Sequence, residues 1–509
     1  MRLARLIPAG VVLVALGAVA GAAQLTHPAP SATSPAATAA RQVAVTSAAR
    51  ACPPAQGGGP VALIARPAGA ASGAGGTSGS ATAGRVELTA LPPAGATLRA
   101  AAPVLAQGPG VLSLLTVPAG VSTGKQHTSV AEGWSVAASG PMAQAVEAEL
   151  AQSSGLASVR CGEPGSDIWF VGPGQQNGAA QIQLDLMNID SLAASVDVTT
   201  ITDAGQAQAG NDNGITVPPH QTVTESLSSM AGGSSVVAVE VHTSIGRVAA
   251  DVAESSSHGG TASWLPSTAA PSTQLVIPGV PPSGSTAGLF LAVPGTASAK
   301  VNVVAITPQG HYRPFGPQTV DLPGESAVYV PLTPLGGTAA ALEITSNVPV
   351  AAAVLVPGSG VGAFAAATAP ISEQAVIAGN TSGSGMAASV VLSAPAGAAR
   401  VRLTEIAPGS SGGASSGGAS SGGASVTGSQ VVSVRAGHTV VAPVTAPRGA
   451  KHGAAFAVVI TPLAGSGPLY AARVETQDQN TIVSIIPAAS ALTTIDLPPV
   501  RDSYTAISP

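Results

Sequence analysis

The sequence predicts a mainly β protein, in which an N-terminal membrane segment precedes tandem immunoglobulin-like β-sandwich repeats. The first observation behind this fold class is composition. The chain is 45% hydrophobic but only 2% aromatic, and it contains 62 Gly and 43 Pro. Small Val and Ala cores with Gly and Pro at the turns suit sheets that pack face to face. The second observation is apolar–polar alternation in short segments, and the third is a repeat of about 100 residues.

The first 23 residues predict the membrane segment. Arg2 and Arg5 precede an uncharged apolar stretch, Leu6 to Ala23, that is long enough to span a bilayer. Basic residues before such a stretch place its start in the cytoplasm. Small residues around Ala20 also fit a signal peptidase site, so an uncleaved anchor and a cleaved signal peptide both stay open. Both alternatives export the rest of the chain, as a single-pass membrane protein or a secreted one, and residues 24–51 form a Pro/Ala/Ser/Thr linker.

Export decides how the two cysteines are interpreted. Cys52 and Cys161 are the only cysteines in 509 residues. Outside the cytoplasm, two cysteines most simply form a disulfide. Closing such a long loop stabilises the fold by up to about 4–5 kcal/mol in the chain-entropy model. The alternative is a pair of free thiols.

Three stretches of the chain repeat one another. The valine-rich triplets that begin at Val196, Val301 and Val401 occupy the same place in three copies, and each is followed by a turn and further strands. A copy offers about six or seven strands, which is the strand count of an immunoglobulin-like sandwich. We name the three predicted sandwiches repeat 1, repeat 2 and repeat 3. They cover residues 163–266, 273–378 and 385–490.

The segments around the repeats are less regular. We interpret residues 52–162 as a degenerate β unit with one helix, because Gly140 to Gly155 places Ala143, Val146 and Leu150 on one helical face. The Ser/Gly tract at residues 410–425 of repeat 3 contains no core-forming residue, so it is predicted to be a disordered loop. Residues 491–509 are predicted to be a tail.

Rare residue types gather in the stretch that runs from Arg160 to Gly174. It contains Cys161, and Trp169 and Phe170 open the first strand of repeat 1 in a chain with only three Trp and five Phe. One such ring fills as much volume as several Val or Ala side chains. We therefore predict that Trp169 and Phe170 are structural anchors between the first unit and repeat 1. The alternative is that Trp169 is an exposed binding platform.

The segment CGEPGSDIWFVGPG, the apolar N-terminus and the valine-rich repeats together resemble a known family. This family consists of secreted or membrane-anchored actinobacterial proteins that are known only as a domain of unknown function. The resemblance covers most of residues 50–500. It implies a location in the cell envelope and supplies no catalytic residues.

The chemistry-bearing residues do not form a recognisable catalytic pattern, so no catalytic, cofactor-binding or metal-binding residue is predicted. Ser122 and Lys125 have the Ser-x-x-Lys spacing of penicillin-recognising enzymes, but the partner motifs are absent. The Gly-x-Ser-x-Gly string at Gly409 lies inside the Ser/Gly tract, where no strained turn is expected. Pro357 interrupts the only string similar to a dinucleotide loop. The eight His are scattered without ligand spacing.

Charge narrows the range of partners. The net charge is −5, and the first 50 residues carry four Arg and no acid, so the rest of the chain is more acidic still. Without a basic run, nucleic acid is not an expected partner. We expect a non-catalytic extracytoplasmic envelope protein that acts as a scaffold or interaction module. It would contact the membrane through its N-terminal segment, and an envelope protein or a cell-wall glycan through its repeats. The rival hypothesis is a cell-wall glycan-binding or enzyme-accessory protein, and the scarcity of aromatic residues argues against it.

Overall fold

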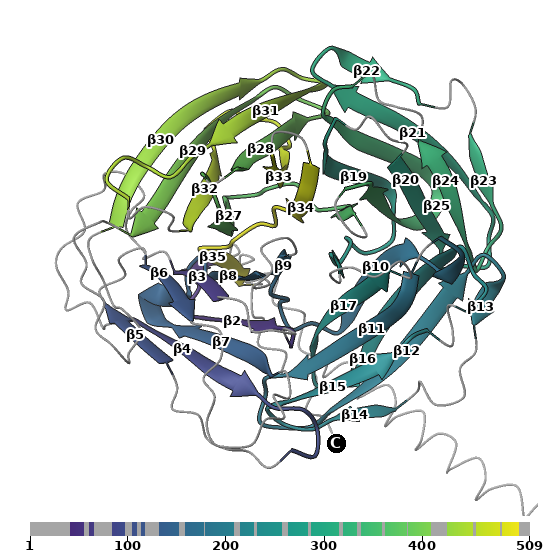
Figure 1. Ribbon diagram of the computed structural model, residues 1–509, viewed down its shortest axis with the longest axis horizontal. Coiled ribbons are helices and arrows are strands. Elements are labelled where there is room, and N and C mark those ends of the chain that lie inside the picture. Colours follow the sequence, from purple (N-terminus) through teal and green to yellow (C-terminus); the bar gives the residue numbers. More distant parts are fainter. Residues whose placement is uncertain are drawn as a thin grey trace, which may run out of the picture. The chain divides into compact units, whose positions relative to one another are not determined.

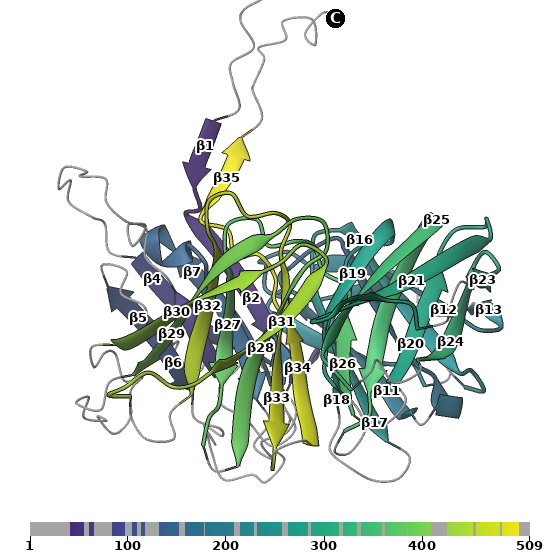
Figure 2. The same ribbon diagram turned by 90° about the horizontal axis from the view of Figure 1, so that it is seen from above.

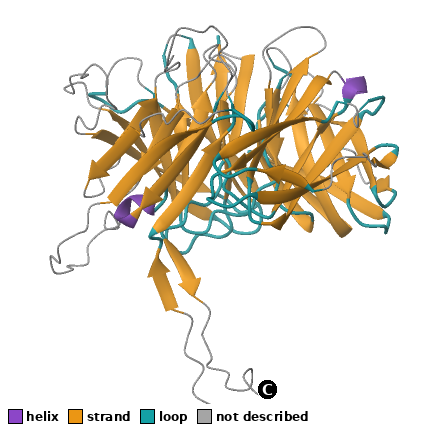
Figure 3. Ribbon diagram, turned by 90° about the horizontal axis from the view of Figure 1, so that it is seen from below, coloured by secondary structure: helices purple, strands orange, loops and turns teal. Residues whose placement is uncertain are grey.

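The structure is a computed structural model that describes most residues between 41 and 497. The described residues are 41–54, 61–65, 84–96, 104–108, 113–117, 132–151, 158–177, 179–207, 214–228, 232–256, 263–282, 287–314, 319–332, 337–358, 362–383, 385–408, 425–450, 455–478 and 481–497. The prediction of a mainly β protein is confirmed, because the described chain consists of strands with two short 3₁₀ helices (Figure 3). The predicted membrane segment lies outside these residues. Within them, no helix combines the length and apolarity needed to cross a membrane.

The chain divides into two compact units. The first comprises residues 1–43 and 495–509, and its described part is the pairing of β1 (Arg41–Ala44) with β35 (Thr494–Leu497). The second comprises residues 44–494, and its strands form four β-sandwiches in chain order. We number these sandwiches 1 to 4.

Sandwich 1 contains the disulfide predicted from the sequence. Its two sheets have the orders β2-β7-β4-β5 and β6-β3-β8-β9. Val86, Leu88, Val136 and Leu150 of both sheets form its core with Cys52 and Cys161. The strands are β2 (Ser47–Cys52), β3 (Val61–Ala65), β4 (Gly84–Leu91), β5 (Val104–Gly108), β6 (Ser113–Val117), β7 (Gly133–Ser139), β8 (Glu147–Ala151) and β9 (Ser158–Arg160).

The helix predicted between Gly140 and Gly155 is wrong. The described part of this segment, residues 140–151, forms one 3₁₀ turn, η1 (Gly140–Ala143), and then strand β8. β8 pairs with β3 on one side and β9 on the other. Every residue from Met142 to Leu150 is buried. The apolar spacing therefore reflects burial on both faces of a central strand, and strand pairing outweighs the helix propensity of Ala, Glu and Leu.

Sandwich 2 packs the sheet β10-β16-β12-β13, with β14 also beside β12, against the sheet β15-β11-β17-β18. Phe170, Leu184, Val196, Val239 and Val252 lie in the core between the two sheets. The elements are β10 (Asp167–Pro173), η2 (Gln175–Asn177), β11 (Ala179–Asn188), β12 (Ala194–Thr202), β13 (Gly205–Ala207), β14 (Ile215–Val217), β15 (Gln221–Ser226), β16 (Val236–Ile245), β17 (Ala249–Ser256) and β18 (Ser263–Leu265).

Sandwich 3 has the same arrangement, but one long strand belongs to both of its sheets. The N-terminal half of β25 pairs with β19 and β21, and its C-terminal half pairs with β20 and β26. Short strands β22 and β23 continue beyond β21, and β24 lies beside β20. The strands are β19 (Ser272–Val280), β20 (Ala287–Val293), β21 (Ala299–Thr307), β22 (Gly310–Tyr312), β23 (Val320–Leu322), β24 (Ser326–Leu332), β25 (Ala340–Val356) and β26 (Ala363–Ala366).

Sandwich 4 consists of the sheets β27-β32-β29-β30 and β31-β28-β33-β34. Its core includes Ile377, Val390, Leu403, Phe456 and Ile460. The strands are β27 (Ala375–Asn380), β28 (Met386–Ala394), β29 (Ala399–Pro408), β30 (Ser425–Val434), β31 (His438–Val444), β32 (Phe456–Pro462), β33 (Tyr470–Gln477) and β34 (Thr481–Pro487).

The sequence repeat corresponds to a repeat of strands. The triplets at Val196, Val301 and Val401 lie in β12, β21 and β29, and each of these strands pairs with the equivalent neighbour: β16, β25 or β32. Some predicted boundaries differ from the strands. β1 and β2 occupy part of the predicted linker, and β35 occupies part of the predicted tail. These segments lack helical spacing or a long alternation, and they become strands because a partner strand from elsewhere in the chain pairs with them.

Within residues 44–494, each sandwich contributes one edge strand to a shared centre. β9 contacts β18, β18 contacts β26, β26 contacts β34, and β34 contacts β9, so the contacts between the four sandwiches close on themselves. Figure 1 shows β9 and β34 near this centre, and β5, β13, β22 and β30, edge strands of the other sheet of each sandwich, far from it. Figure 2 gives the view at right angles.

Candidate functional site

Charged side chains are buried where sandwich 4 meets sandwich 1. The side chains of Arg473 on β33 and Glu149 on β8 are 0% and 2% exposed, and Arg473 Nη1 forms an ion pair with Glu149 Oε1. The same nitrogen donates to the carbonyl oxygen of Gly379. Arg473 Nη2 donates to the hydroxyl oxygens of Ser158 and Ser484, at 2.6 and 2.8 Å. We call these five residues the central cluster.

Strand alternation explains how a charge comes to lie inside sandwich 4. Ala471, Arg473 and Glu475 share one face of β33, because successive side chains of a strand point to opposite sides. Ala471 belongs to the sandwich core. Arg473 extends that core towards Gly379 on β27, and Glu475 accepts a hydrogen bond from the amide of Thr381, at 2.8 Å.

Glu149 reaches this interior from sandwich 1 through the space that Gly379 leaves free. The amide of Gly379 donates to Glu149 Oε2 at 2.9 Å. A Cβ atom on Gly379 would lie only 3.0 Å from the Glu149 carboxyl carbon. Burial raises the pKa of Glu149, and the negative charge of Glu475 adds to the rise while Arg473 opposes it. One guanidinium therefore balances two buried carboxyl groups.

A second group of charges surrounds Glu147, two residues before Glu149 on the same face of β8. Arg50 Nη2 donates to Glu147 Oε1 at 3.1 Å, and Arg160 Nε donates to Glu147 Oε2 at 2.8 Å. The Glu147 side chain is 2% exposed. The bonds link β2, β8 and β9, so they join the two sheets of sandwich 1.

Two carboxyl groups face each other where sandwich 2 meets sandwich 1. Asp185 on β11 lies directly opposite Asp251 on β17, and both are buried. Thr224 donates to Asp185 at 2.6 Å. Burial raises the pKa of Asp185 to about 6. Burial also raises the pKa of Asp251 well above its usual range, and the charge of Asp185 adds to the rise, although Arg160 of sandwich 1 acts in the opposite direction.

Glu254 on β17 is a third buried acid of sandwich 2. It is 1% exposed. Within the described part of the chain, neither carboxyl oxygen has a hydrogen-bond partner. Burial raises the pKa of Glu254 to about 8, so the group is largely neutral at pH 7.

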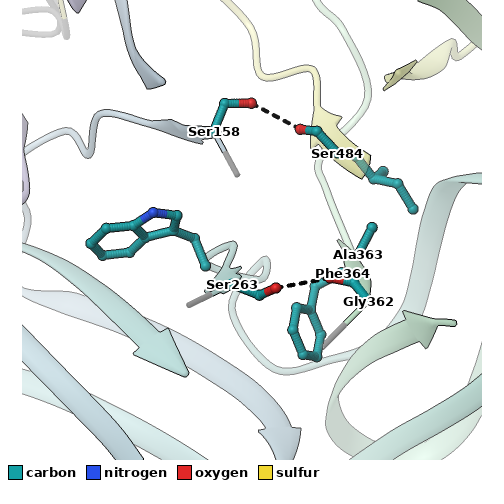
Figure 4. Close-up of a pocket in the computed structure, with 8 residues that line it drawn as sticks. Ser158, Ser263, Gly362, Ala363, Phe364 and Ser484 are labelled. Atoms are coloured by element: carbon teal, nitrogen blue, oxygen red, sulfur yellow. Dashed lines mark hydrogen bonds between the residues drawn. The ribbon is translucent and has the colours of Figure 1, made fainter. Parts of the chain in front are cut away.

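A cavity of about 20 Å³ lies where the four central edge strands meet. Ser158, Ser263, Phe364 and Ser484 line it, each from a different one of β9, β18, β26 and β34. Figure 4 shows the two hydrogen bonds that cross it: Ser158 with Ser484 at 2.8 Å, and Ser263 with the carbonyl of Gly362 at 2.9 Å. This volume accommodates one water molecule, not an organic substrate.

A second cavity of about 130 Å³ lies beside an aromatic pair of sandwich 3. The rings of Phe290 on β20 and Tyr329 on β24 have centroids 5.3 Å apart. Asn177 of sandwich 2 contributes a polar group to the lining. Tyr329 is half-buried, whereas Phe290 is fully buried.

The structure forms the predicted disulfide between Cys52 and Cys161, and both residues are 0% exposed. Cys52 ends β2 and Cys161 follows β9, so the bond joins the inner edges of the two sheets of sandwich 1. β9 supplies Ser158 to the central cluster. The disulfide therefore lies three residues along the chain from the candidate site.

Trp169 and Phe170 lie on opposite faces of β10. Phe170 enters the core of sandwich 2. Trp169 is 6% exposed and packs with Phe290 and Ala353 of sandwich 3. The alternative that Trp169 is an exposed binding platform does not match its low exposure. Its role as an anchor stays a prediction, and the side chain contacts repeat 2 rather than the first unit.

The charged residues of the central cluster were not predicted from the sequence. A charge inside an otherwise apolar strand was the available signal: Arg473 lies within LYAARVE, and Glu149 lies within VEAEL. No local pattern shows that these two residues, 324 positions apart, meet. Ser122, Lys125 and Gly409 lie outside the described residues, and among those described no three potential metal ligands form a group.

Most hydrogen-bonding groups of the central cluster are used within the protein, and Arg473 Nε is the cluster's one buried guanidinium nitrogen without a hydrogen-bond partner among the described residues. Arg473 engages a carboxylate, a carbonyl and two hydroxyls, and Glu149 receives the Gly379 amide as well. The bonds link β8 and β9 of sandwich 1 to β27, β33 and β34 of sandwich 4. This arrangement connects the first sandwich to the last one.

These features define the class of the molecule as a mainly β repeat protein of four sandwiches, with a buried charged cluster between the first and the last. Residues 117–445 match the model of a family of unknown function (DUF5719), and the chain belongs to this family. The search of curated proteins finds no match.

Proposed function

We propose that this protein is a non-catalytic extracytoplasmic envelope protein that acts as a scaffold or interaction module. The observation that carries the proposal is the central cluster. Its buried charges are paired across the junction of sandwiches 1 and 4, over 324 residues of chain. Such bonding supports a stable platform with several outward-facing sheets, which suits contact with other envelope components.

The buried disulfide supports the extracytoplasmic part of this proposal, because structural disulfides persist in oxidising compartments. Alkaline phosphatase is active only where its own disulfides form, so a fusion after Pro509 tests the location. We expect an active fusion, and an inactive one would contradict export. In wild type, a thiol reagent should label neither cysteine without reductant, whereas Cys52→Ser should expose Cys161 to the reagent once the chain is denatured.

Interaction is tested by affinity capture from envelope fractions. The full chain is cross-linked in intact cells and purified under denaturing conditions, and Arg473→Met, which leaves Glu149 buried without its cation, serves as the variant with a disrupted centre. A defined set of envelope proteins recovered with wild type and reduced with the variant supports the scaffold role. Recovery of the same background proteins with both chains and with an empty-vector control contradicts it.

One observation favours a second candidate function, cell-wall glycan binding. The cavity beside the aromatic pair is lined by Phe290, Tyr329 and the polar residue Asn177, and sugars are bound at sites that combine an apolar face with hydrogen-bonding groups. Tyr329→Ala should then reduce retention of the full chain on purified cell wall. Tyr312→Ala is the matched control, because Tyr312 is 44% exposed on β22 but lies outside the cavity lining. Equal retention of all three proteins would remove this candidate.

A further inference from the structure

The outer edge of sandwich 4 differs from the equivalent edges of sandwiches 2 and 3. In sandwich 2, two three-residue strands, β13 and β14, pair with β12. Sandwich 3 has two three-residue strands, β22 and β23, at the same position. In sandwich 4, a single ten-residue strand, β30, pairs with β29 along its whole length and without a register shift.

β30 lacks the features that protect an open strand edge. Among the described strands, β29 is its only partner. Its sequence, SVTGSQVVSV, contains neither a charge nor a proline. The free N–H and C=O groups of an edge strand pair readily with another strand. Proteins usually protect such edges by keeping the edge strand short or by placing Lys or Pro in it. The short edge strands of sandwiches 2 and 3 fit that rule, and β30 departs from it.

The exposed side chains of this edge strand are small and uncharged. Ser429, Val431 and Ser433 are exposed, Val431 to 52%. Val432 and Val434, which alternate with them, pack in or against the core of sandwich 4. An extended uncharged strand with small side chains would cover the free backbone groups of this edge, and β30 itself has that chemistry.

We propose that β30 pairs in antiparallel fashion with β30 of a second copy of this chain. The two-fold symmetry of such a pair makes one surface complementary to itself. Pairing over most of the ten residues requires the two-fold axis to pass close to residues 429–431. The two uncharged edges bring no like charges together, and the sheet of sandwich 4 continues into the partner. This interface is separate from the central cluster and does not depend on the compartment proposed above.

A charge at the centre of the edge tests the pairing. Val431→Lys would place two lysines close to each other across the axis, and we expect the dimer dissociation constant of the full chain to rise at least tenfold. Sedimentation velocity over a dilution series measures this change. Tyr312→Lys, which adds the same charge to an exposed position on the short edge strand β22, should behave as wild type. A monomeric wild type, or an equal effect of both substitutions, overturns the proposal.

Cysteine cross-linking identifies the strand that pairs. The variants are Ser429→Cys, Val431→Cys and the double variant, which together cover an axis at residue 429, 430 or 431. Under mild oxidation, at least one of them should give a disulfide-linked dimer on a non-reducing gel, and Tyr312→Cys should not. The native cysteines are buried and paired, so they do not compete. Failure of all three variants to cross-link overturns the pairing, even if the wild type is dimeric.

Discussion

The junction between sandwiches 2 and 3 and the junction between sandwiches 4 and 1 are built differently. The first is apolar: Trp169 and Val171 of β10 pack against Phe290, Ala351 and Ala353 of sandwich 3. The second has an apolar part, which includes Ala145, Val376 and Ile406, but it also contains the ion pair of Glu149 and Arg473. Sandwiches 2 and 3 therefore pack through small and aromatic side chains, whereas sandwiches 4 and 1, the last and the first along the chain, also meet through charges.

The difference teaches how each junction is specified. Apolar contact is non-directional and scales with the area removed from water. Neighbouring repeats are already held close by the chain, so such contact is sufficient for them. Sandwiches 1 and 4 are far apart in sequence, and many surfaces compete for each of them. A buried ion pair adds little net stability, but it makes every arrangement that leaves one charge unpaired costly.

Removing the guanidinium is expected to have the largest effect. Arg473→Met leaves Glu149 and Glu475 buried without their cation, and we expect a loss of about 3–5 kcal/mol at neutral pH. Thermal unfolding of the full chain measures it. The loss should shrink at acidic pH, because burial already raises the pKa of Glu149 and a protonated carboxyl needs no cation. Lys300→Met, which breaks the exposed pair with Asp321, should cost under about 1 kcal/mol.

The double variant Glu149→Gln/Arg473→Met sharpens the same point. Replacing both members of a buried pair leaves no isolated charge, so most of the loss seen with Arg473→Met should be recovered. If the double variant is as unstable as the sum of the single ones, the two side chains act independently, and the comparison of the two junctions fails.

Truncating Trp169 tests the apolar junction. Trp169→Ala should cost about 3–5 kcal/mol, since the ring is buried between sandwiches 2 and 3. Unlike the loss from Arg473→Met, this loss should not shrink at pH 5, because the substitution removes apolar contacts and leaves no buried charge without its partner. Glu240 lies opposite Trp169 on β16, and burial raises its pKa, so removing the ring should if anything make the loss smaller at pH 8 than at pH 5. A loss from Trp169→Ala that shrinks in acid would contradict the division into apolar and charged junctions.

The buried acids of sandwich 2 predict that the wild type is more stable in mild acid. Asp185 has its pKa raised to about 6, and Glu254 to about 8. The folded state thus holds these protons more tightly than the unfolded chain does. The stabilisation from protonated Asp185 should be lost as pH rises from about 4 to about 6. That from protonated Glu254 should be lost as pH rises from about 4 to about 8. Glu254→Gln should flatten the upper part of the profile of unfolding free energy against pH, by on the order of 3–4 kcal/mol between pH 5 and 8.

The smallest effect is expected at Gly379. Gly379→Ala brings a Cβ to 3.0 Å from the carboxyl carbon of Glu149, so Glu149 must shift and its hydrogen bonds lengthen. We expect a loss of about 1 kcal/mol by thermal unfolding. Gly295→Ala is the matched control, since nothing lies within 4 Å of the added atom. A loss of the same size at Gly295 would mean that backbone entropy, not contact with Glu149, sets the cost.

The sequence by itself determined the mainly β class, the repeat and the pairing of Cys52 with Cys161. Alternation and repetition are visible within short segments, and two cysteines leave only one intramolecular bridge. Tertiary structure decided the rest. It made β8 of the segment predicted to be a helix, because pairing on both sides outweighs helix propensity. It also decided which sandwich Trp169 faces and that Arg473 meets Glu149. Local periodicity shows which face of a strand is covered, but the partner that covers it comes from a distant part of the chain.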